Sequence, residues 1–441
     1  MDYKSIFNMH LNENNINFWE NNNKKQEKVI YGLSGLVNMG NTCYMNATLQ
    51  CLSKIRCLND FMIDNTLYEN EFYQYLSENI KDYLVQKQIK ENNLDDDEYI
   101  DIYVKDIKER EKISITHSLH ILLQKMWTNN SYITPDAMRY AIVKAPQSIF
   151  NNYSQHDSQE ILTLILDRIH EECKTTANID FGKLSSKSME MMKKINDYLK
   201  KIKKEILNDD EKQKIVEEYN KYKSDNFNDY IIYKSFVQWK LHIDKFGCSF
   251  LTDLFCGQYL SLITCSSCHT KSPTFSVFME PISIPISDSG ENTLDECLSE
   301  FIKEEYLTDN NQYYCEICKD KKDASKQILL YDLPPIIIIQ LKRYKNNGFR
   351  TSRKNSKVTF PIKDMCFSKY MSKYKTDNSL YNLCAVTQQI GSLNGGHYVA
   401  QGLNHLNNKW YLYDDATVTS ISEEDIITNN SYILYYEKSS N

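Results

Sequence analysis

The stretch that decides the fold reads Gly35-Leu36-Val37-Asn38-Met39-Gly40-Asn41-Thr42-Cys43-Tyr44-Met45-Asn46. Its glycines predict a turn, and the apolar residues that follow recur at helical spacing, namely Met45, Leu49, Leu52 and Ile55. We therefore expect a helix from Thr42 to Ile55, with one stripe facing a core. Cys43 falls in its first turn, where unpaired N–H groups and the positive end of the helix dipole favour a thiolate.

Cys43 is therefore a candidate nucleophile. The turn before it can aim backbone amides and the Asn38 side chain at one point, as an oxyanion hole requires. Judged by itself, a cysteine on an amphipathic helix is more often an inert core residue. The catalytic interpretation needs a base elsewhere in the chain.

His397 is the candidate base, because Gly395 and Gly396 precede it and a strand follows. Glycines lack a Cβ, so a substrate backbone can pass close to the imidazole. A second strand, 409–413, is followed directly by Asp414 and Asp415. Antiparallel pairing of the two strands would bring these carboxylates near the ring. Side chains alternate along a strand, so only one carboxylate can face the ring directly. Alone, His397 would be interpreted as a surface histidine.

Four cysteines form two C-x2-C pairs, Cys265-Ser-Ser-Cys268 and Cys315-Glu-Ile-Cys318. Each pair can offer two thiolates from a tight turn, and two such turns close a tetrahedral zinc site with no open position. Such a metal is structural and takes no part in catalysis. The alternative is four free structural thiols.

Composition excludes several classes of protein. The 441 residues carry a net charge of -7, whereas a nucleic-acid-binding domain is typically basic. No apolar run is long enough to span a bilayer, and the first residues show no secretory pattern. Thirteen cysteines, an odd number in a long chain, fit reduced thiols better than a disulfide framework. We expect a cytosolic or nuclear protein.

The order of the predicted elements indicates the α+β class. Residues 1–32 read as a disordered Asn- and Lys-rich leader, and a helix capped by Asp157 runs to about Glu172. Segments 88–112 and 174–234 read as insertions, more plausibly solvated surface than partner sites. Later in the chain the hydrophobic period changes to two, which predicts strands at 258–264, 274–286, 326–331, 336–344, 381–389, 397–402, 409–413 and 431–437.

Taken in order, these motifs resemble the ubiquitin-specific protease family of cysteine deubiquitinases. The resemblance covers residues 33–438. It rests on the segment from Gly35 to Asn46, which we call the cysteine box, on its continuation to Gln50, and on the two cysteine pairs. Four further motifs add to it: Gln155-His-Asp-Ser-Gln-Glu160, Leu333-Pro-Pro335 with Gln340-Leu-Lys-Arg-Tyr344, Gly395-Gly-His-Tyr398, and Ser431-Tyr-Ile-Leu-Tyr-Tyr436. The stretch from Trp239 to Thr274, with Ser272 to Phe278, is most similar to the endosomal, receptor-sorting branch.

The resemblance implies a papain-like right-hand fold with a helical thumb (about 33–250), antiparallel β fingers tipped by the four-cysteine zinc site (about 251–330) and a β-rich palm (about 331–438). It implies that Cys43 is the nucleophile, His397 the base, Asp414 its orienter and Asn38 an oxyanion donor. It also implies binding of the ubiquitin tail by five residues, namely Gln155, Asp157, Gly395, Gly396 and Tyr398.

The implied activity is hydrolysis of the bond after ubiquitin's C-terminal glycine through a thioester, with structural zinc and no catalytic cofactor. The implied partners are ubiquitin and ubiquitinated proteins, and a monomer is expected. A cytoplasmic location is expected, with nuclear or endosome-associated sites left open. Two alternatives remain: a same-fold protease for a ubiquitin-like modifier, and a catalytically weak ubiquitin-binding scaffold.

Overall fold

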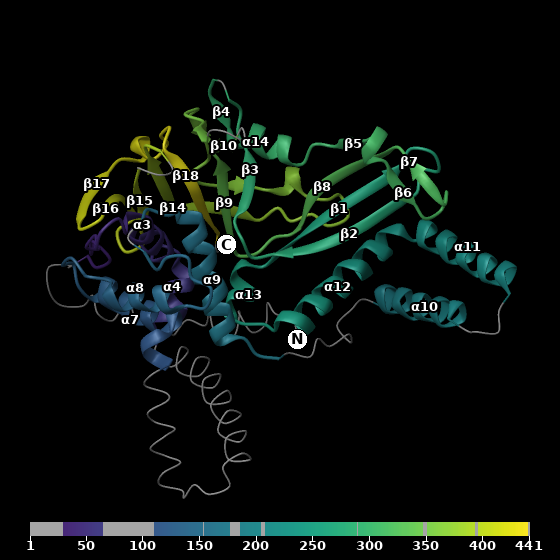
Figure 1. The fold of residues 1–441 in the computed structure, drawn as a ribbon, viewed down its shortest axis with the longest axis horizontal. Helices are drawn as coiled ribbons and strands as arrows, with labels where there is room; N and C mark the ends of the chain where they lie inside the picture. The colour runs from purple at the N-terminus through teal and green to yellow at the C-terminus, as the bar shows by residue number, and fades with distance from the viewer. Residues whose placement is uncertain are drawn as a thin grey trace, which may run out of the picture.

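The computed structural model describes residues 30–64, 110–152, 154–176, 186–203, 208–288, 290–346, 351–392 and 396–439. Most of the predicted leader, 1–29, and most of the first predicted insertion, 88–109, lie outside these residues. Within the described part, helices form one side of the molecule and strands the other (Figure 1). None of the described helices is both long enough and apolar enough to cross a membrane.

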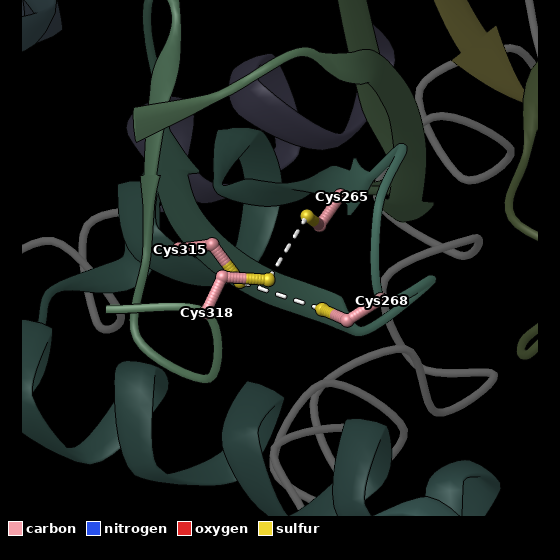
Figure 2. A group of neighbouring side chains, drawn as sticks. All are labelled: Cys265, Cys268, Cys315 and Cys318. Atoms are coloured by element: carbon pink, nitrogen blue, oxygen red, sulfur yellow. Dashed lines mark hydrogen bonds between the residues drawn. The ribbon is translucent and has the colours of Figure 1, made fainter. Parts of the chain in front are cut away.

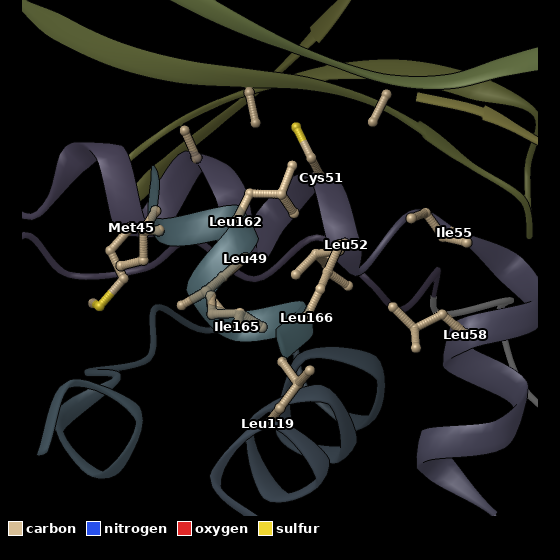
Figure 3. Packing of buried hydrophobic residues seen from close by; sticks show 14 of the residues in the cluster. Met45, Leu49, Cys51, Leu52, Ile55, Leu58, Leu119, Leu162, Ile165 and Leu166 are labelled. Atoms are coloured by element: carbon tan, nitrogen blue, oxygen red, sulfur yellow. The ribbon is translucent and has the colours of Figure 1, made fainter. Parts of the chain in front are cut away.

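A cluster of helices surrounds the cysteine box. They are α3 (Cys43–Leu52), α4 (Arg56–Ile63), α7 (Ile115–Thr128), α8 (Asp136–Lys144), α9 (Ser158–Cys173) and α13 (Phe250–Phe255). Figure 3 shows Leu49 and Leu52 of α3 beside Leu162 and Ile165 of α9. The stripe predicted to face a core is buried, and burial extends beyond it, because all ten residues of α3 are buried. The helix lies between α9 and the strands β14 (Leu380–Ile390) and β15 (His397–Asn404), so it has no solvent face.

The helix predicted to run to Ile55 ends at Leu52. Ile55 is nevertheless fully buried, as the residue that precedes α4. The predicted second helix corresponds to α9, where Asp157 accepts a hydrogen bond from the backbone N–H of Gln159 at 2.8 Å, as a helix cap does.

An eight-stranded sheet forms the palm-like half, in the order β17-β16-β15-β14-β18-β9-β3, with β13 paired to β14. Its strands are β3 (Ile282–Pro285), β9 (Ile336–Lys342), β13 (Met365–Cys366), β14 (Leu380–Ile390), β15 (His397–Asn404), β16 (Lys409–Asp414), β17 (Thr417–Ile421) and β18 (Ser431–Lys438). All pairs are antiparallel except β3 with β9. One face of this sheet packs on α3, which places the C-terminal strands against the cysteine box.

A second sheet of order β2-β1-β8-β5 extends away from the first (Figure 1). It contains β1 (Gly257–Cys265), β2 (Lys271–Phe278), β8 (Ala324–Asp332) and β5 (Glu305–Leu307), and the hairpin β6 (Tyr313–Cys315) with β7 (Asp320–Lys322) lies at its far end. The single strand predicted over 274–286 is two strands in different sheets, β2 and β3. The break falls at Pro281, which lacks the N–H that a continuous ladder needs.

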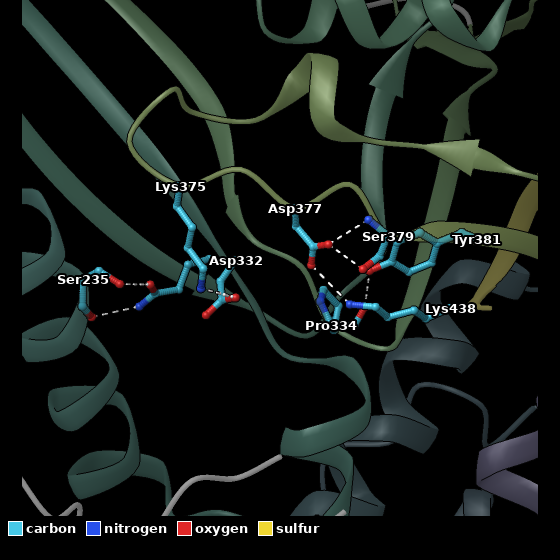
Figure 4. A network of polar contacts seen from close by, with 9 residues as sticks. Ser235, Asp332, Pro334, Lys375, Asp377, Ser379, Tyr381 and Lys438 are labelled. Atoms are coloured by element: carbon cyan, nitrogen blue, oxygen red, sulfur yellow. Dashed lines mark hydrogen bonds and ion pairs between the residues drawn. The ribbon is translucent and has the colours of Figure 1, made fainter. Parts of the chain in front are cut away.

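Polar side chains join the two sheets (Figure 4). Lys375 bonds Asp332 at the end of β8 with 2.6 Å between Nζ and Oδ1. Lys438 bonds Asp377 at 3.2 Å, and Tyr381 donates to the carbonyl of Pro334 at 2.9 Å. The Lys375 and Tyr381 contacts hold the base of the second sheet against the eight-stranded one.

The predicted insertion at 174–234 contains α10 (Ser186–Ile202) and α11 (Asp209–Asp225), and α12 (Phe227–Phe246) follows and lies along β2 (Figure 1). In α10, Met191 and Ile195 are buried while Leu199 is exposed. The described residues of α11 include no buried side chain, which fits a solvated surface. Remaining short elements are β4 (Asn292–Thr293), α14 (Leu294–Phe301), β10 (Tyr344–Asn346), β11 (Thr351–Arg353), β12 (Val358–Thr359), and three 3-10 turns at Asp309–Asn311, Ser368–Tyr370 and Glu423–Asp425.

Candidate active site

Cys43 is the first residue of α3 and is 1% exposed. Gly40 and Asn41 before it have φ values of 92° and 54°, so the chain turns sharply into the helix. Burial is the main cause that raises the pKa of the Cys43 thiol, and the Asp415 carboxylate adds to it, while backbone N–H groups of Tyr398 and Tyr44 oppose it. The expected lowering of this pKa by the helix terminus is therefore outweighed in the structure, because the strands cover the thiol.

His397 and Asp414 meet where the neighbouring strands β15 and β16 begin and end, next to α3. His397 begins β15, Asp414 ends β16, and the two strands are antiparallel with Ala400 opposite Tyr413. His397 Nε2 lies 2.6 Å from Asp414 Oδ1. Asp414, and not Asp415, is therefore the carboxylate in hydrogen-bond contact with the ring. A carboxylate at this distance fixes the ring orientation and selects the tautomer with a proton on Nε2.

Asp415 contacts two asparagines of the cysteine box instead. Its Oδ2 accepts from Asn38 Nδ2 at 2.9 Å, and its Oδ1 accepts from Asn46 Nδ2 at 2.8 Å. Asn38 Oδ1 in turn accepts from the backbone N–H groups of Gly40 and Thr42. The amide of Asn38 is thus held on both sides, and its nitrogen has a second hydrogen that the Asp415 bond does not use.

Close backbone approach explains one of the glycines. The backbone N–H of Leu36 donates to the carbonyl of Asp415 at 2.8 Å, and a Cβ added at Gly35 would lie 2.2 Å from the Ala416 carbonyl oxygen. Any larger residue at position 35 would separate the cysteine box from the strand end that contains Asp414 and Asp415.

The residues predicted to bind a peptide tail also gather here. Asp157 Oδ2 accepts from the hydroxyl of Tyr432 at 2.7 Å, and burial is the main cause that raises its pKa. Tyr398 is 2% exposed and lies beside Tyr432. Gln155 bonds the backbone of Gly396. Gly395 lies outside the described residues.

Two groups near the site were not predicted from the sequence. Arg139 of α8 donates to the carbonyl of Met39 at 2.8 Å and so supports the turn before Cys43. On α9, burial raises the pKa of Asp167 to about 6, and the nearby Glu280 and Glu171 carboxylates raise it further. The influence of Glu280 on Asp167 could not be expected from local sequence, because Glu280 lies far away along the chain.

The four cysteines of the two pairs lie together at the tip of the second sheet (Figure 2). Sulfur atoms of Cys265 and Cys318 are 4.0 Å apart, and those of Cys268 and Cys315 are 3.5 Å apart. Both pairs sit on matching turns, because His269 N–H donates to Cys265 O and Lys319 N–H donates to Cys315 O. The four thiols are therefore positioned to bind one metal ion.

Comparison with known proteins identifies the family. The model named ubiquitin carboxyl-terminal hydrolase matches residues 34–436. Ubiquitin carboxyl-terminal hydrolase 2 of Bos taurus is 28% identical over 420 residues, which cover 94% of this chain and 56% of that protein. The probable ubiquitin carboxyl-terminal hydrolase R319 of Acanthamoeba polyphaga mimivirus is 27% identical over 433 residues, covering 93% and 91%. The chain thus spans little more than half the length of the bovine relative.

Solved structures show the same fold. The SAGA Ubp8/Sgf11/Sus1/Sgf73 DUB module bound to ubiquitin aldehyde matches with a TM-score of 0.58 and 20% identity, over 96% of this chain and 74% of that chain. The α+β right-hand architecture predicted from the sequence is confirmed, whereas the endosomal branch stays a prediction. Because the family model covers nearly the whole chain, this protein belongs to the ubiquitin carboxyl-terminal hydrolase family.

Proposed function

We propose that this chain is a cysteine protease that hydrolyses the peptide or isopeptide bond after the C-terminal glycine of ubiquitin. The observation that carries the proposal is the 2.6 Å contact between His397 and Asp414, on strands that pack against the helix beginning at Cys43. A nucleophile, a base and a group that orients the base thus lie at one place. Membership of the hydrolase family supports the same activity.

In the proposed mechanism, Cys43 Sγ attacks the glycine carbonyl carbon, and the carbonyl π electrons move to oxygen. Asn38 Nδ2 and the Cys43 backbone N–H donate to this oxyanion. His397 accepts the thiol proton and gives it to the amine as the C–N bond breaks, which leaves a thioester. Water then attacks the thioester carbon while His397 takes a water proton. The C–S bond breaks, ubiquitin leaves with a free C-terminal carboxyl group, and His397 returns the proton to the Cys43 sulfur. The raised thiol pKa fits a base that removes the proton during attack.

We propose that ubiquitin's extended, arginine-containing tail binds along the start of α9. Asp157 offers the carboxylate, and Tyr398 and Gly396 border the path to Cys43. Gly395, also predicted to bind the tail, lies outside the described residues. Ten residues after Asp157, about 15 Å along the helix, Asp167 with Glu280 and Glu171 supplies further negative charge for a basic tail.

We propose that the cysteine cluster holds zinc, since four thiolates in two matching turns form the donor set of a closed tetrahedral site. Such a site leaves no position for a substrate, so zinc would stabilise the finger tip. The division into thumb, fingers and palm near residues 250 and 330 is proposed because α13 ends at Phe255 and β8 of the second sheet ends at Asp332. Strand β3 of the eight-stranded sheet nevertheless lies within 251–330.

The test is reaction of the pure protein with ubiquitin that bears an electrophilic C-terminus, together with cleavage of an isopeptide-linked ubiquitin substrate. Wild type is expected to form a one-to-one adduct and to release ubiquitin. Cys43→Ala is expected to do neither, while Cys51→Ala and Cys57→Ala retain the adduct. Undiminished adduct in Cys43→Ala would remove the nucleophile assignment.

The same probes on ubiquitin-like proteins separate the alternatives. A protease for another modifier would react with that modifier and not with ubiquitin. A scaffold would bind ubiquitin without forming an adduct. The intact group of Cys43, His397 and Asp414 favours the enzyme over the scaffold.

A further inference from the structure

Gln155 lies in a loop that is anchored on both sides. The ring of His156, the next residue, packs edge-on against Tyr44 and Phe150, with ring centroids 5.6 Å and 4.9 Å away. Asp157 caps α9 and accepts the hydroxyl of Tyr432 from the sheet. The backbone that carries Gln155 is therefore fixed to α3 on one side and to β18 on the other.

The Gln155 side chain makes a two-way contact with the backbone of Gly396. Its Oε1 accepts from the Gly396 N–H at 2.8 Å, and its Nε2 donates to the Gly396 carbonyl. The same Nε2 lies 3.9 Å from Cys43 Sγ, within hydrogen-bond range of a sulfur. One side chain thus connects the residue before His397 with the start of α3.

Gly396 lies close to the end of β14. A Cβ there would lie 2.5 Å from the Ile390 carbonyl oxygen and 2.6 Å from that of Ser392, so the two ends of the turn nearly touch. Arg353 holds the first end, because its Nη2 donates to the Gln389 carbonyl at 2.6 Å. Gln155 holds the second end, immediately before the histidine.

We propose that Gln155 is a positioning residue that sets His397 relative to Cys43 through its paired hydrogen bonds to Gly396. In this role Gln155 acts on His397 and does not bind the ubiquitin tail directly. The kcat and KM measurements rest on the proposed function, whereas the alkylation measurement does not. Without the pairing, only the β14–β15 ladder, in which His397 lies opposite Ile390, holds the backbone before the histidine, and no side chain ties it to the start of α3. His397 then shifts relative to the thiol. A displacement of about 1 Å in such a pair costs on the order of 100-fold in rate.

The experiment measures alkylation of Cys43 by iodoacetamide between pH 5.5 and 9, followed at the Cys43 peptide by mass spectrometry, alongside kcat and KM for a ubiquitin substrate. The variants are Gln155→Met, which keeps the length but removes both bonds, and Gln155→Glu, which keeps only the acceptor. Gln159→Met is the matched control, because the Gln159 side chain bonds Thr163 within α9. Thermal unfolding verifies that each variant is folded.

Both Gln155 variants are expected to lose between about 10- and 100-fold in the Cys43 alkylation rate near pH 6.5 and in kcat, with KM changed less than threefold and the control unchanged. Wild-type alkylation in folded Gln155→Met, or a rise in KM alone, would overturn the assignment and make Gln155 a tail contact. If one variant does not fold, the other decides. Alkylation needs no ubiquitin, so a wild type inert towards ubiquitin would end the proposed function and leave this test standing.

Discussion

Replacing Asp157 by asparagine should separate its two tasks, as helix cap and as binding group for a basic tail. The amide oxygen can still accept the Gln159 N–H that the carboxylate accepts at 2.8 Å. The charge-assisted bond from Tyr432 is lost, at a cost of about 1–2 kcal/mol. The raised pKa of Asp157 indicates that burying its charge is unfavourable. Removing that charge therefore offsets much of the cost of the lost hydrogen bond. We therefore expect the free energy of unfolding to change by less than about 1 kcal/mol.

Binding should respond more strongly. A hydrogen bond between a carboxylate and an arginine is worth about 1.5–3 kcal/mol, which corresponds to an increase of roughly 10- to 100-fold in KM. The value of kcat should stay within about threefold, since Asp157 does not contact the reacting atoms. Asp157→Ala should also lose the cap and leave the Tyr432 hydroxyl without its acceptor, and should destabilise by about 2–4 kcal/mol.

The assay combines urea unfolding with initial rates on a ubiquitin substrate for both variants. Asp295→Asn is the matched control, because Asp295 also accepts a tyrosine hydroxyl, that of Tyr370, but lies at the start of α14. An unchanged KM in a folded Asp157→Asn variant would refute the binding role and leave only the helix cap.

Three other sites give predictions, namely the cysteine cluster, the carboxylates beside His397, and Lys54. Metal analysis should find about one zinc per chain, and Cys265→Ser should lower the melting temperature more than it slows Cys43 alkylation; active, folded protein without zinc would contradict the site. Asp414→Ala should lower kcat about 100-fold or more, whereas Asp414→Asn should retain much of kcat. Asp415→Ala should lower kcat less than Asp414→Ala does. The reverse order would show that Asp415, and not Asp414, is the carboxylate that acts on His397. Burial lowers the pKa of Lys54 to about 7, so the unfolded chain binds one more proton than the folded chain between about pH 7 and 10.5. The free energy of unfolding of wild type relative to Lys54→Met should therefore rise over that window, by up to about 1.4 kcal/mol per pH unit. A difference in urea unfolding that does not change with pH would refute this.

The Lys54 example shows what the sequence could not supply. Lys54 follows α3 in a stretch that reads as an ordinary helix end, yet it is 2% exposed. Its Nζ donates to the Gly32 carbonyl at 3.0 Å and lies over the rings of Trp127 and Tyr413. These partners come from three distant segments, so no local pattern marks the residue as buried.

Local rules did determine much of the site. The helix dipole, the alternation of strand side chains and the C-x2-C spacing depend on residues within a few positions of one another, and they led to Cys43, to a carboxylate beside His397 and to the four cysteines. The fold class followed from the change of hydrophobic period along the chain.

Only the tertiary structure decided how these local pieces act on one another. It divided the predicted strand 274–286 between two sheets, covered α3 on all sides, and so raised the thiol pKa that the helix terminus alone would lower. It also directed Asp415 to Asn38 and Gln155 to Gly396, contacts between segments more than 200 residues apart. The physical reason is that desolvation and long-range hydrogen bonds depend on which surfaces pack together, and that packing is a property of the whole folded chain.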